Sequence, residues 1–390
     1  MQVVSYTRGY ATINLDSIQQ NIESMKSNLH ENTQMMLIVK ADGYGHGAIP
    51  VAKTFESIDY IWGFGVATLD EGIILRNAGI TKPILILGCV FPEQYAEVLQ
   101  HDIRINIYNE EMAQEISRLA KLANTSVHMH IKIDSGMTRL GFLCNDESLD
   151  SIEAISKLDN VILEGIFTHF AKADEEDKTY TNLQFEAFLH MINSLEARNI
   201  FFELKHCSNS AGIIDHPECN MDIVRAGISL YGLYPSEEVL DTQVPLVPAL
   251  SFISSIASIK EIKAGTAVSY GGIFKALQDM KIATVPIGYA DGYARSLSNQ
   301  GYVLVNGRKA PIIGRICMDQ FMIDVTAIDD AAFMTPVVLI GESDGVKLPV
   351  ETLSEISGRF NYEFICGINK RIPRIYIKNG EIEDQIDYFA

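Results

Sequence analysis

The chain has 390 residues, of which 47% are hydrophobic and 21% are charged, as in ordinary globular proteins. This length exceeds one typical domain and suits two. The formal net charge of −19 argues against nucleic-acid binding, because that function needs a basic surface.

Three further features restrict the class of protein. No apolar run reaches the length that spans a membrane. The first six residues show neither the charged nor the apolar part of a signal peptide. The six cysteines lie far apart without a Cys-x-x-Cys pair, which favours reduced thiols over a disulfide or zinc framework. Together these features predict a cytoplasmic protein.

The first part of the chain alternates strand-like apolar runs with helical patterns. The eight predicted strands cover residues 35–39, 61–66, 83–87, 103–107, 127–134, 161–168, 201–206 and 221–225. The helical patterns are clearest at 48–55, at 181–195 and after Thr68, where Glu71 completes a capping-box spacing. This content predicts an α/β fold with an N-terminal (β/α)8 TIM-type barrel. An open doubly wound sheet is the alternative, but no Gly-x-Gly-x-x-Gly follows a strand.

The pattern changes beyond Tyr234. Short β-branched runs separated by Gly and Pro turns occupy residues 252–262, 281–287, 302–305, 311–315, 321–325 and 336–341. They predict a mostly-β C-terminal domain. We therefore expect a barrel domain over residues 1–240 and a β-strand-rich domain over 241–390. Residues 1–15 are expected to pair with the β domain, because residues 10–15 alternate apolar and polar before the first barrel unit.

Lys40 ends the first apolar run of the barrel. Gly43, Gly45 and Gly47 follow it, so the backbone can turn sharply there. A lysine at the end of a buried strand is costly unless it is paired or deprotonated, and a deprotonated lysine suits Schiff-base chemistry. The alternative is a lysine whose amine reaches out of the strand end into water.

The predicted strand at 127–134 has titratable residues on one face. Its strict alternation points His128, His130 and Lys132 the same way, toward the barrel interior. Two histidines at this spacing could bind a metal, but no third ligand is evident. Hydrogen-bonded filling of the interior is the other interpretation, and we predict no metal site.

Several reactive side chains lie toward the carboxyl ends of the predicted strands, where barrels carry their active sites. They are Lys40, Lys132, His169, His206 and Arg225. The loops after the seventh and eighth strands form the usual phosphate site of such barrels. Its candidate donors here are Asn209, Ser210, Gly227 and Ile228.

These residues lie in motifs that resemble those of alanine racemases, a family of pyridoxal-phosphate-dependent amino-acid racemases. The motifs cover residues 39–47 (VKADGYGHG), 132–139, 206–210, 225–228, 268–271, 288–292 and 314–319. The resemblance extends over the whole chain. It implies interconversion of L- and D-alanine, which would supply D-alanine for bacterial cell-wall peptidoglycan. It also implies the cofactor pyridoxal 5'-phosphate and a homodimer with shared active sites.

The resemblance further implies roles around the cofactor. Lys40 would bind pyridoxal phosphate covalently and act as one catalytic base. The phosphate would contact Tyr44, Asn209, Ser210 and the amides of Gly227 and Ile228. His169 would pack against the cofactor ring.

A second group would act on the polar atoms of the ring. Arg225 would hydrogen-bond the pyridine nitrogen, with His206 behind it. Arg139 would contact the ring hydroxyl and the substrate. Lys132 would be carbamylated, which turns a cation into an anion that orients Arg139.

The resemblance assigns the remaining residues to the β domain and the access route. Inversion at Cα needs a proton removed on one face and another added on the opposite face, so two bases are required. Tyr270 of the partner subunit would be the second catalytic base. Tyr289 and the Met318 amide, also from the partner, would line the substrate carboxylate site. The access corridor would contain Asp174, Arg295, Arg315 and Asp319.

One position departs from the family pattern. Before Arg371 the family commonly has a tyrosine that reaches the phosphate and narrows the pocket, whereas this chain has Lys370. The substitution implies relaxed specificity, with serine or a larger amino acid as a further substrate.

Three other functions share some of these sequence features. A pyridoxal-phosphate decarboxylase of basic amino acids shares this architecture, but it places a carboxylate at the pyridine nitrogen, where this chain has Arg225. A non-catalytic pyridoxal-phosphate-binding protein would lack the β domain with Tyr270. A metal-dependent barrel hydrolase could use His128, His130 and a carboxylated Lys132, but no partner histidines or closing aspartate occur in the needed places.

Overall fold

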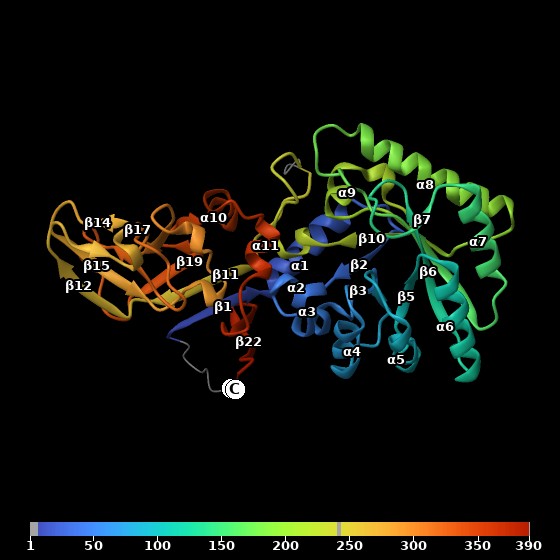
Figure 1. The fold of residues 1–390 in the computed structure, drawn as a ribbon, viewed down its shortest axis with the longest axis horizontal. Helices are drawn as coiled ribbons and strands as arrows, with labels where there is room; N and C mark the ends of the chain where they lie inside the picture. Colours follow the sequence, from blue (N-terminus) through green and yellow to red (C-terminus); the bar gives the residue numbers. More distant parts are fainter. Residues whose placement is uncertain (1–6, 240–242, 390) are drawn as a thin grey trace. The chain divides into compact units, whose positions relative to one another are not determined.

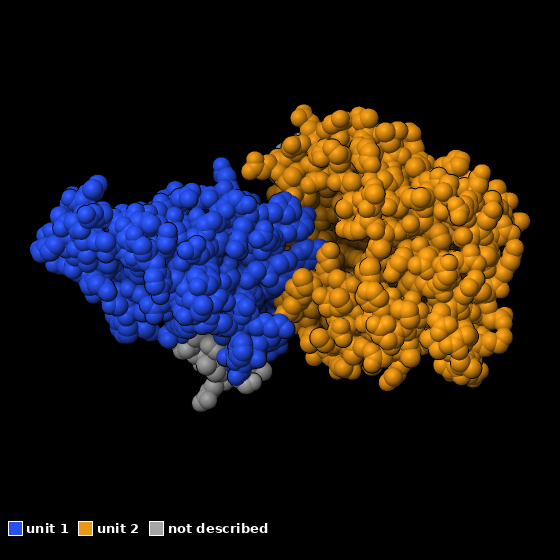
Figure 2. All heavy atoms as spheres, viewed as in Figure 1, with its two compact units in different colours: residues 1–16, 44–46, 249–390 blue, residues 17–43, 47–248 orange. Residues whose placement is uncertain are grey.

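The computed structural model describes residues 7–239 and 243–389. These residues form two compact units, coloured separately in Figure 2. One unit contains the described parts of residues 1–16, 44–46 and 249–390, and the other contains those of 17–43 and 47–248. Two expectations fall outside the described residues. One is the domain boundary between residues 240 and 241, and the other concerns a signal peptide over residues 1–6.

The second unit is built on eight parallel strands in the order β10-β2-β3-β4-β5-β6-β8-β9. They are β2 (Gln34–Ile38), β3 (Ile61–Val66), β4 (Ile84–Ile86), β5 (Arg104–Ile107), β6 (Val127–Asp134), β8 (Val161–Phe167), β9 (Leu204–His206) and β10 (Ile223–Ala226). The short β7 (Phe142–Leu143) pairs with β6. Backbone amides of Asp222 and Arg225 donate to the carbonyls of Lys205 and Ser208, so hydrogen bonds also join the last two segments of the ring.

Helices alternate with these strands and lie around them in Figure 1. They are α1 (Leu15–Ser27), α2 (Lys40–Tyr44), α3 (Ala48–Phe55), α4 (Leu69–Asn77), α5 (Tyr95–Gln100), α6 (Glu110–Leu122), α7 (Asp146–Ser156), α8 (Thr179–Ala197) and α9 (Ser210–Asp215). Short 3-10 turns cover Pro92–Gln94, Pro217–Cys219 and Ile228–Tyr231. The side chains of Thr68, Asn109 and Asn145 cap α4, α6 and α7, which explains where these helices begin.

Most strand residues are buried, as expected for parallel strands between helices and an interior core, although the first four residues of β8 are partly exposed. Met35, Leu37, Ile105, Met129 and Ile131 are all fully buried. The predicted fold class, a TIM-type barrel followed by a mostly-β domain, is confirmed.

The first unit is rich in β-strands. Its large sheet has the order β12-β15-β18-β17-β16-β19-β11-β1-β21-β22, with β20 beside β19. The strands are β1 (Gly9–Asn14), β11 (Leu250–Ser255), β12 (Ser258–Ile262), β15 (Met280–Val285), β16 (Tyr302–Val305), β17 (Arg308–Ile313), β18 (Phe321–Asp324), β19 (Pro336–Ser343), β20 (Val346–Leu348), β21 (Arg374–Lys378) and β22 (Glu381–Ile386).

Smaller elements complete this unit. They are β13 (Ala267–Val268), β14 (Phe274–Lys275), α10 (Val350–Ser357), α11 (Asn361–Cys366) and the 3-10 turns η4 (Tyr270–Gly272), η5 (Tyr289–Asp291) and η6 (Arg295–Leu297). The first strand, β1, pairs antiparallel with β11 and parallel with β21, so the beginning of the chain is part of this sheet (Figure 1).

The run at 252–262 forms two strands rather than one. The break falls at Ile256, whose amide donates to Thr335, while the next amide, of Ala257, donates to Thr284 on β15. The chain therefore leaves the β19 side and continues beside β15. The sequence patterns also missed α10, α11, β21 and β22.

Two expectations concern the cysteines and membranes. All six cysteines are free, and all lie in the described part of the chain. Among the described residues, no helix is both long and apolar enough to cross a membrane.

Candidate active site

Lys40 lies where β2 ends and the chain makes a left-handed turn. Ala41, Asp42 and Gly43 have φ values of 52°, 52° and 62°. Such a conformation costs L-residues free energy and must be held by surrounding contacts. The Gly43 amide donates to the Val39 carbonyl at 2.8 Å, and the Asp42 side chain accepts from the Ala48 amide at 2.9 Å. The turn therefore holds the backbone that carries Lys40 in one conformation.

Arg225 on β10 is a buried cation among neutral partners. Its Nη1 donates to His206 Nδ1 at 2.9 Å. Its Nη2 lies 2.8 Å from the carbonyls of Thr168 and Cys207 and 3.1 Å from His169 Nδ1. Burial lowers the pKa of Arg225 to about 10, so the guanidinium keeps its charge near neutral pH. The predicted contact between Arg225 and His206 is thus present.

Lys132 on β6 is buried with little compensation for its charge. Its Nζ donates to the Ile133 carbonyl at 2.8 Å and lies 5.2 Å from the Phe167 ring centroid. Burial, followed by the charge of Arg225, lowers the pKa of Lys132 to about 7. A large fraction of this amine is therefore neutral, and nucleophilic, at physiological pH.

The loop after β6 presents Arg139 to solvent. The carboxylate of Asp134 accepts hydrogen bonds from the amides of Gly136, Thr138 and Arg139 at 3.0, 2.9 and 3.1 Å. Asp134 thus shapes the segment that carries the exposed Arg139 side chain.

The predicted phosphate donors lie after β9 and β10. Ser210 Oγ accepts hydrogen bonds from the amides of Gly227 and Ser229 at 3.0 and 3.3 Å, which leaves its proton to donate elsewhere. Ile228 is buried beside them. Asn209 has a structural contact that was not predicted, because its side chain caps α9 by accepting from the Gly212 amide.

The surroundings of His169 lower its pKa. Burial lowers the pKa of His169 well below its usual range, and neighbouring cations lower it further. These cations are Arg225, Arg139, Lys132 and Lys40. The barrel thus gathers four of the predicted site residues around a neutral histidine. Such a site suits a small ligand with more than one negative charge.

The catalytic candidates of the β-rich unit are exposed. Tyr270, Tyr289 and Met318 have 71, 41 and 53% of their surface accessible. Backbone hydrogen bonds from Tyr289 to the Cys317 carbonyl and from Ala290 to the Met318 carbonyl join the two turns that carry Tyr289 and Met318. A Cβ on Gly288 would lie 2.3 Å from the Met318 oxygen, so glycine permits this approach.

The remaining predicted residues are dispersed over the two units. Tyr44 is buried, with its ring centroid 6.0 Å from that of Tyr362. Lys370 is exposed, with Nζ 5.3 Å from the Tyr388 ring centroid. The corridor candidates Asp174 and Arg315 are half-buried, and Arg295 and Asp319 are exposed.

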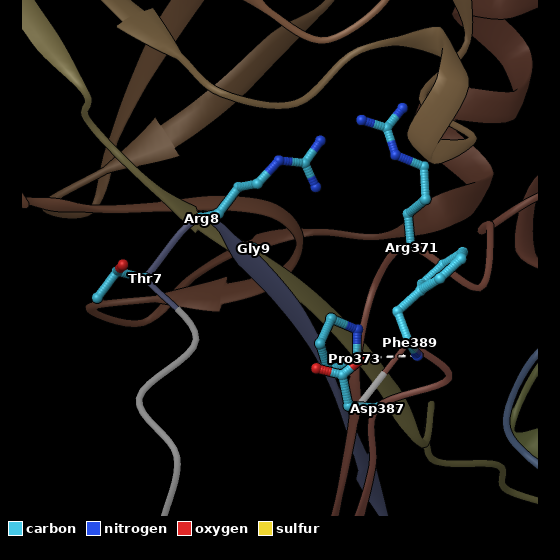
Figure 3. A pocket seen from close by; sticks show the side chains of 7 residues that line it. All are labelled: Thr7, Arg8, Gly9, Arg371, Pro373, Asp387 and Phe389. Carbon is cyan, nitrogen blue, oxygen red and sulfur yellow. Dashed lines mark hydrogen bonds between the residues drawn. The ribbon is translucent and has the colours of Figure 1, made fainter.

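A cavity in the β-rich unit is lined by Thr7, Arg8, Gly9, Arg371, Pro373, Asp387 and Phe389 (Figure 3). The side chains of Arg8 and Arg371 extend to the same side in this view. Arg8 Nη2 lies 2.7 Å from both carboxylate oxygens of Asp291, and Arg371 Nε lies 3.5 Å from one of them. Asp291 also accepts from the Gly288 amide at 3.0 Å, so these arginines brace the turn of Tyr289.

Three residues with contacts to the site were not singled out as site residues from the sequence. Glu71 was noted only for its capping-box spacing, but its carboxylate binds the turn after Lys40. His130 was considered as a metal ligand or as interior filling, and it contacts His206 and Glu164. Strand alternation places His130 inward, so the sequence could have indicated His130 as a site residue. Nothing in the pattern pointed to Glu164. His128 Nδ1 lies 4.0 Å from the Asp102 carboxylate.

The fold and these side chains define a barrel enzyme whose reactive amines and histidines lie at the carboxyl ends of the strands. The alanine racemase N-terminal domain family matches residues 13–235, and the alanine racemase C-terminal domain family matches residues 249–376. The chain belongs to the alanine racemase family, which is a family of isomerases.

Individual relatives agree with this assignment. The alanine racemase of Desulforamulus reducens is 42% identical over 94% of this chain and 98% of its own length. The solved structure of alanine racemase from Clostridium difficile 630 has a TM-score of 0.95 at 39% identity, covering 100% of both chains. A histidine racemase from Leuconostoc mesenteroides subsp. sake is similar at 28% identity and a TM-score of 0.88, covering 96% of this chain and 99% of that chain.

Proposed function

We propose that this chain interconverts L- and D-alanine with pyridoxal phosphate as cofactor. The observation that carries the proposal is the cluster at the carboxyl ends of the strands, where the Arg225 guanidinium lies 2.9 Å from His206 and 3.1 Å from His169. The Lys132 amine lies over the same Phe167 ring as Arg225. The residues fit the cofactor because its phosphate and ring oxygen are anionic and the site is rich in basic residues. The hydrogen-bond partners of Arg225 described above are all neutral, so they do not neutralise its charge. When bound, the cofactor supplies an electron sink for the carbanion at Cα.

Each contact is assigned to a part of the cofactor. Lys40 binds it covalently, and His169 packs on its ring. Its phosphate is held by Tyr44, Ser210 and the amides of Gly227 and Ile228, with Asn209 supporting the loop. Arg139 holds the ring hydroxyl and the substrate.

Arg225 governs the protonation of the pyridine nitrogen. Its pKa of about 10 keeps the guanidinium charged, so it donates a hydrogen bond without giving up a proton. Arg225 would therefore hold the ring nitrogen unprotonated, and the weaker electron sink that the cofactor would then supply would favour reprotonation of Cα over side reactions. A decarboxylase of basic amino acids, the alternative function, would instead place a carboxylate there.

Two bases move the proton at Cα. Lys40 acts on one face, and Tyr270 of the partner subunit acts on the other. Exposure of the Tyr270 side chain in the isolated chain supports this arrangement, because a phenol that exchanges a proton with substrate must be shielded by another surface. The partner's Tyr289 and the partner's Met318 contribute to the substrate carboxylate site. We assign Asp174, Arg295, Arg315 and Asp319 to the access corridor, with His206 behind Arg225.

Lys132 is proposed to be carbamylated. A neutral amine adds to carbon dioxide, and the lowered pKa of Lys132 keeps a large fraction of it neutral near pH 7. The product is an anion near Arg225 and Arg139, whose charges contribute to lowering that pKa. The modification would therefore turn a repulsive cluster into a paired one.

Specificity is proposed to be broader than for alanine alone. Lys370 stands where the family commonly has tyrosine, and its amine lies over Tyr388. The similar histidine racemase acts on a larger amino acid with a related fold. Serine is the further substrate that we expect here.

Chiral chromatography tests the function directly. Purified protein with added pyridoxal phosphate is incubated separately with L-alanine, L-serine and L-lysine. We expect D-alanine to accumulate to equality with L-alanine, D-serine to form more slowly, and lysine to remain unchanged. Release of carbon dioxide from lysine without racemisation of alanine would establish the decarboxylase instead. Complementation would test the supply of D-alanine for peptidoglycan. The expressed gene should allow a bacterium that requires D-alanine to grow without it.

A further inference from the structure

A chain of hydrogen bonds runs through the barrel interior behind Arg225. Arg225 Nη1 lies 2.9 Å from His206 Nδ1, His206 Nε2 lies 3.0 Å from His130 Nδ1, and His130 Nε2 lies 2.9 Å from Glu164 Oε2. The two histidines are fully buried. The groups come from β10, β9, β6 and β8, so the chain crosses from the end of the strands toward the middle of β8.

The chemistry at its two ends fixes the direction of every bond. A guanidinium has only donors, so His206 Nδ1 must be an unprotonated acceptor. Burial, followed by the charge of Arg225, keeps the pKa of His206 well below its usual range, so this ring is neutral and carries its proton on Nε2. That proton can only be donated to His130 Nδ1. Burial also lowers the pKa of His130, whose remaining proton on Nε2 is donated to Glu164.

Glu164 is an ionised acceptor at the far end. Burial alone would raise its pKa, but the hydrogen bond from His130 and the charge of Arg104 contribute to lowering it. Arg104 Nε lies 3.4 Å from the carboxylate. The negative charge at this end complements the buried positive charge of Arg225 at the other.

Packing leaves the rings no alternative position. The His206 ring stacks on Phe167 with centroids 4.7 Å apart and an interplanar angle of 1°. A Cβ on Gly165 would lie 2.3 Å from His130 Nδ1, so glycine provides the space for this ring. The two rings therefore keep their positions when the hydrogen bonding at Glu164 changes.

We propose that Glu164 is a positioning residue for Arg225, acting through a one-way chain of hydrogen bonds over His130 and His206. If His130 carried its proton on Nδ1, it would donate to His206 Nε2. His206 would then have to carry its proton on Nδ1, and two donors, His206 Nδ1 and Arg225 Nη1, would face each other. Because the guanidinium excludes that tautomer, loss of the carboxylate leaves the Nε2 proton of His130 without its acceptor and removes the negative charge at the far end of the chain from Arg225. The contact of Arg225 with the cofactor rests on the proposed function, but the tautomers do not.

Nitrogen-15 NMR of the full-length holoprotein with labelled histidine tests this proposal, with signals assigned by single histidine substitutions. In the wild type, His130 and His206 should each be neutral with the proton on Nε2. Glu164→Gln retains an acceptor oxygen and should keep both tautomers. Glu164→Met removes it, and because Arg225 still requires an acceptor at His206 Nδ1, both tautomers should persist while the His130 Nε2 proton loses its partner and its NMR signal shifts. Asp102→Asn is the matched control, because it removes a charge beside Arg104 and leaves the chain of bonds intact.

The outcomes separate this proposal from the proposed function. A wild-type His206 protonated on Nδ1, or an unchanged His130 Nε2 signal in Glu164→Met, overturns the proposal even if the protein racemises alanine. Because the wild-type measurement alone can overturn it, the test does not depend on a variant that folds. The expected tautomers without any racemase activity would support the chain of bonds and reject the proposed function. In an active enzyme, kcat should fall roughly tenfold further in Glu164→Met than in Glu164→Gln, with KM little changed.

Discussion

The carboxylate of Glu71 bridges the amides of Ala41 and Ala67, each at 2.7 Å. Ala41 is the first residue after Lys40 and begins the left-handed turn, whereas Ala67 follows β3. One carboxylate thus fastens the ends of two neighbouring strands. An ionised carboxylate accepts with both oxygens, which no neutral side chain of this size can do.

Replacement of Glu71 by Gln should therefore weaken the turn. An amide accepts with one oxygen and presents a donor to the other backbone amide, so we expect a loss of about 1–3 kcal/mol in the free energy of unfolding. Denaturant unfolding followed by circular dichroism measures it. Asp70→Asn is the matched control, since Asp70 lies exposed in the same helical turn. Equal stability of both variants would show that the bridge contributes nothing.

The proposed covalent link predicts a chemical signature at Lys40. Reduction of the holoprotein with borohydride should fix the cofactor on the peptide that contains Lys40, as read by mass spectrometry. Lys40→Ala should bind the cofactor only reversibly and lose activity by roughly a thousandfold or more. An adduct on another lysine would reject the assignment.

Lys132 should respond to carbon dioxide and to pH. Activity should fall when dissolved carbon dioxide is removed and return with bicarbonate, and Lys132→Ala should be partly rescued by small carboxylates. An active wild-type crystal grown with bicarbonate that shows a plain ammonium would reject carbamylation.

The pH dependence of stability has a defined sign for unmodified Lys132. Its pKa of about 7 lies below the usual lysine value of 10.5, so between these values the unfolded state binds more protons. The stability of apoprotein free of carbon dioxide, relative to Lys132→Met, should therefore rise from pH 7 toward 10.5. A constant difference between the two proteins over this range would contradict the lowered pKa.

Shared active sites predict complementation between inactive proteins. Lys40→Ala and Tyr270→Ala homodimers should both be nearly inactive. After co-refolding, about half of the dimers are mixed, and one of their two sites contains Lys40 together with Tyr270 of the partner subunit. Activity should return to about a quarter of wild type. Mixtures that stay inactive despite verified heterodimers would show that Tyr270 acts within its own chain.

Lys370 should influence the choice of substrate. Lys370→Tyr restores the residue common in the family and should raise the ratio of alanine to serine kcat/KM by roughly tenfold. Competition assays on both amino acids measure this ratio. Lys370→Met controls for the loss of charge without adding a ring. An unchanged ratio in both variants would place Lys370 outside the specificity determinants.

The barrel could be predicted from the sequence because strand-like runs, several of them almost wholly apolar, alternate with helical patterns along the first part of the chain. Lys40, His206 and Arg225 could be placed at one edge because parallel strands end on the same side. The contact partners of interior residues could not be predicted in the same way. Strand alternation places His130 inward, but its bonds to Glu164 and His206 depend on register and on the space beside Gly165.

The β-rich unit was harder to predict, for two physical reasons. The run at 252–262 is continuous in sequence, and its break reflects a change of neighbouring strand that hydropathy does not record. The last strand, β22, is largely exposed and carries several charged residues, so it lacks the alternation that marks a half-buried strand.

The pairing of β1 with β11 and β21 has a consequence for synthesis of the chain. The whole barrel is inserted between two strands of one sheet, so β1 leaves the ribosome long before its neighbours exist. At ordinary translation rates this interval is on the order of tens of seconds. The barrel can fold as a unit in that time, whereas the β-rich unit must wait for the last strands. Nascent chains should therefore acquire protease resistance in the barrel first, and loss of β21 should leave β1 with an open edge.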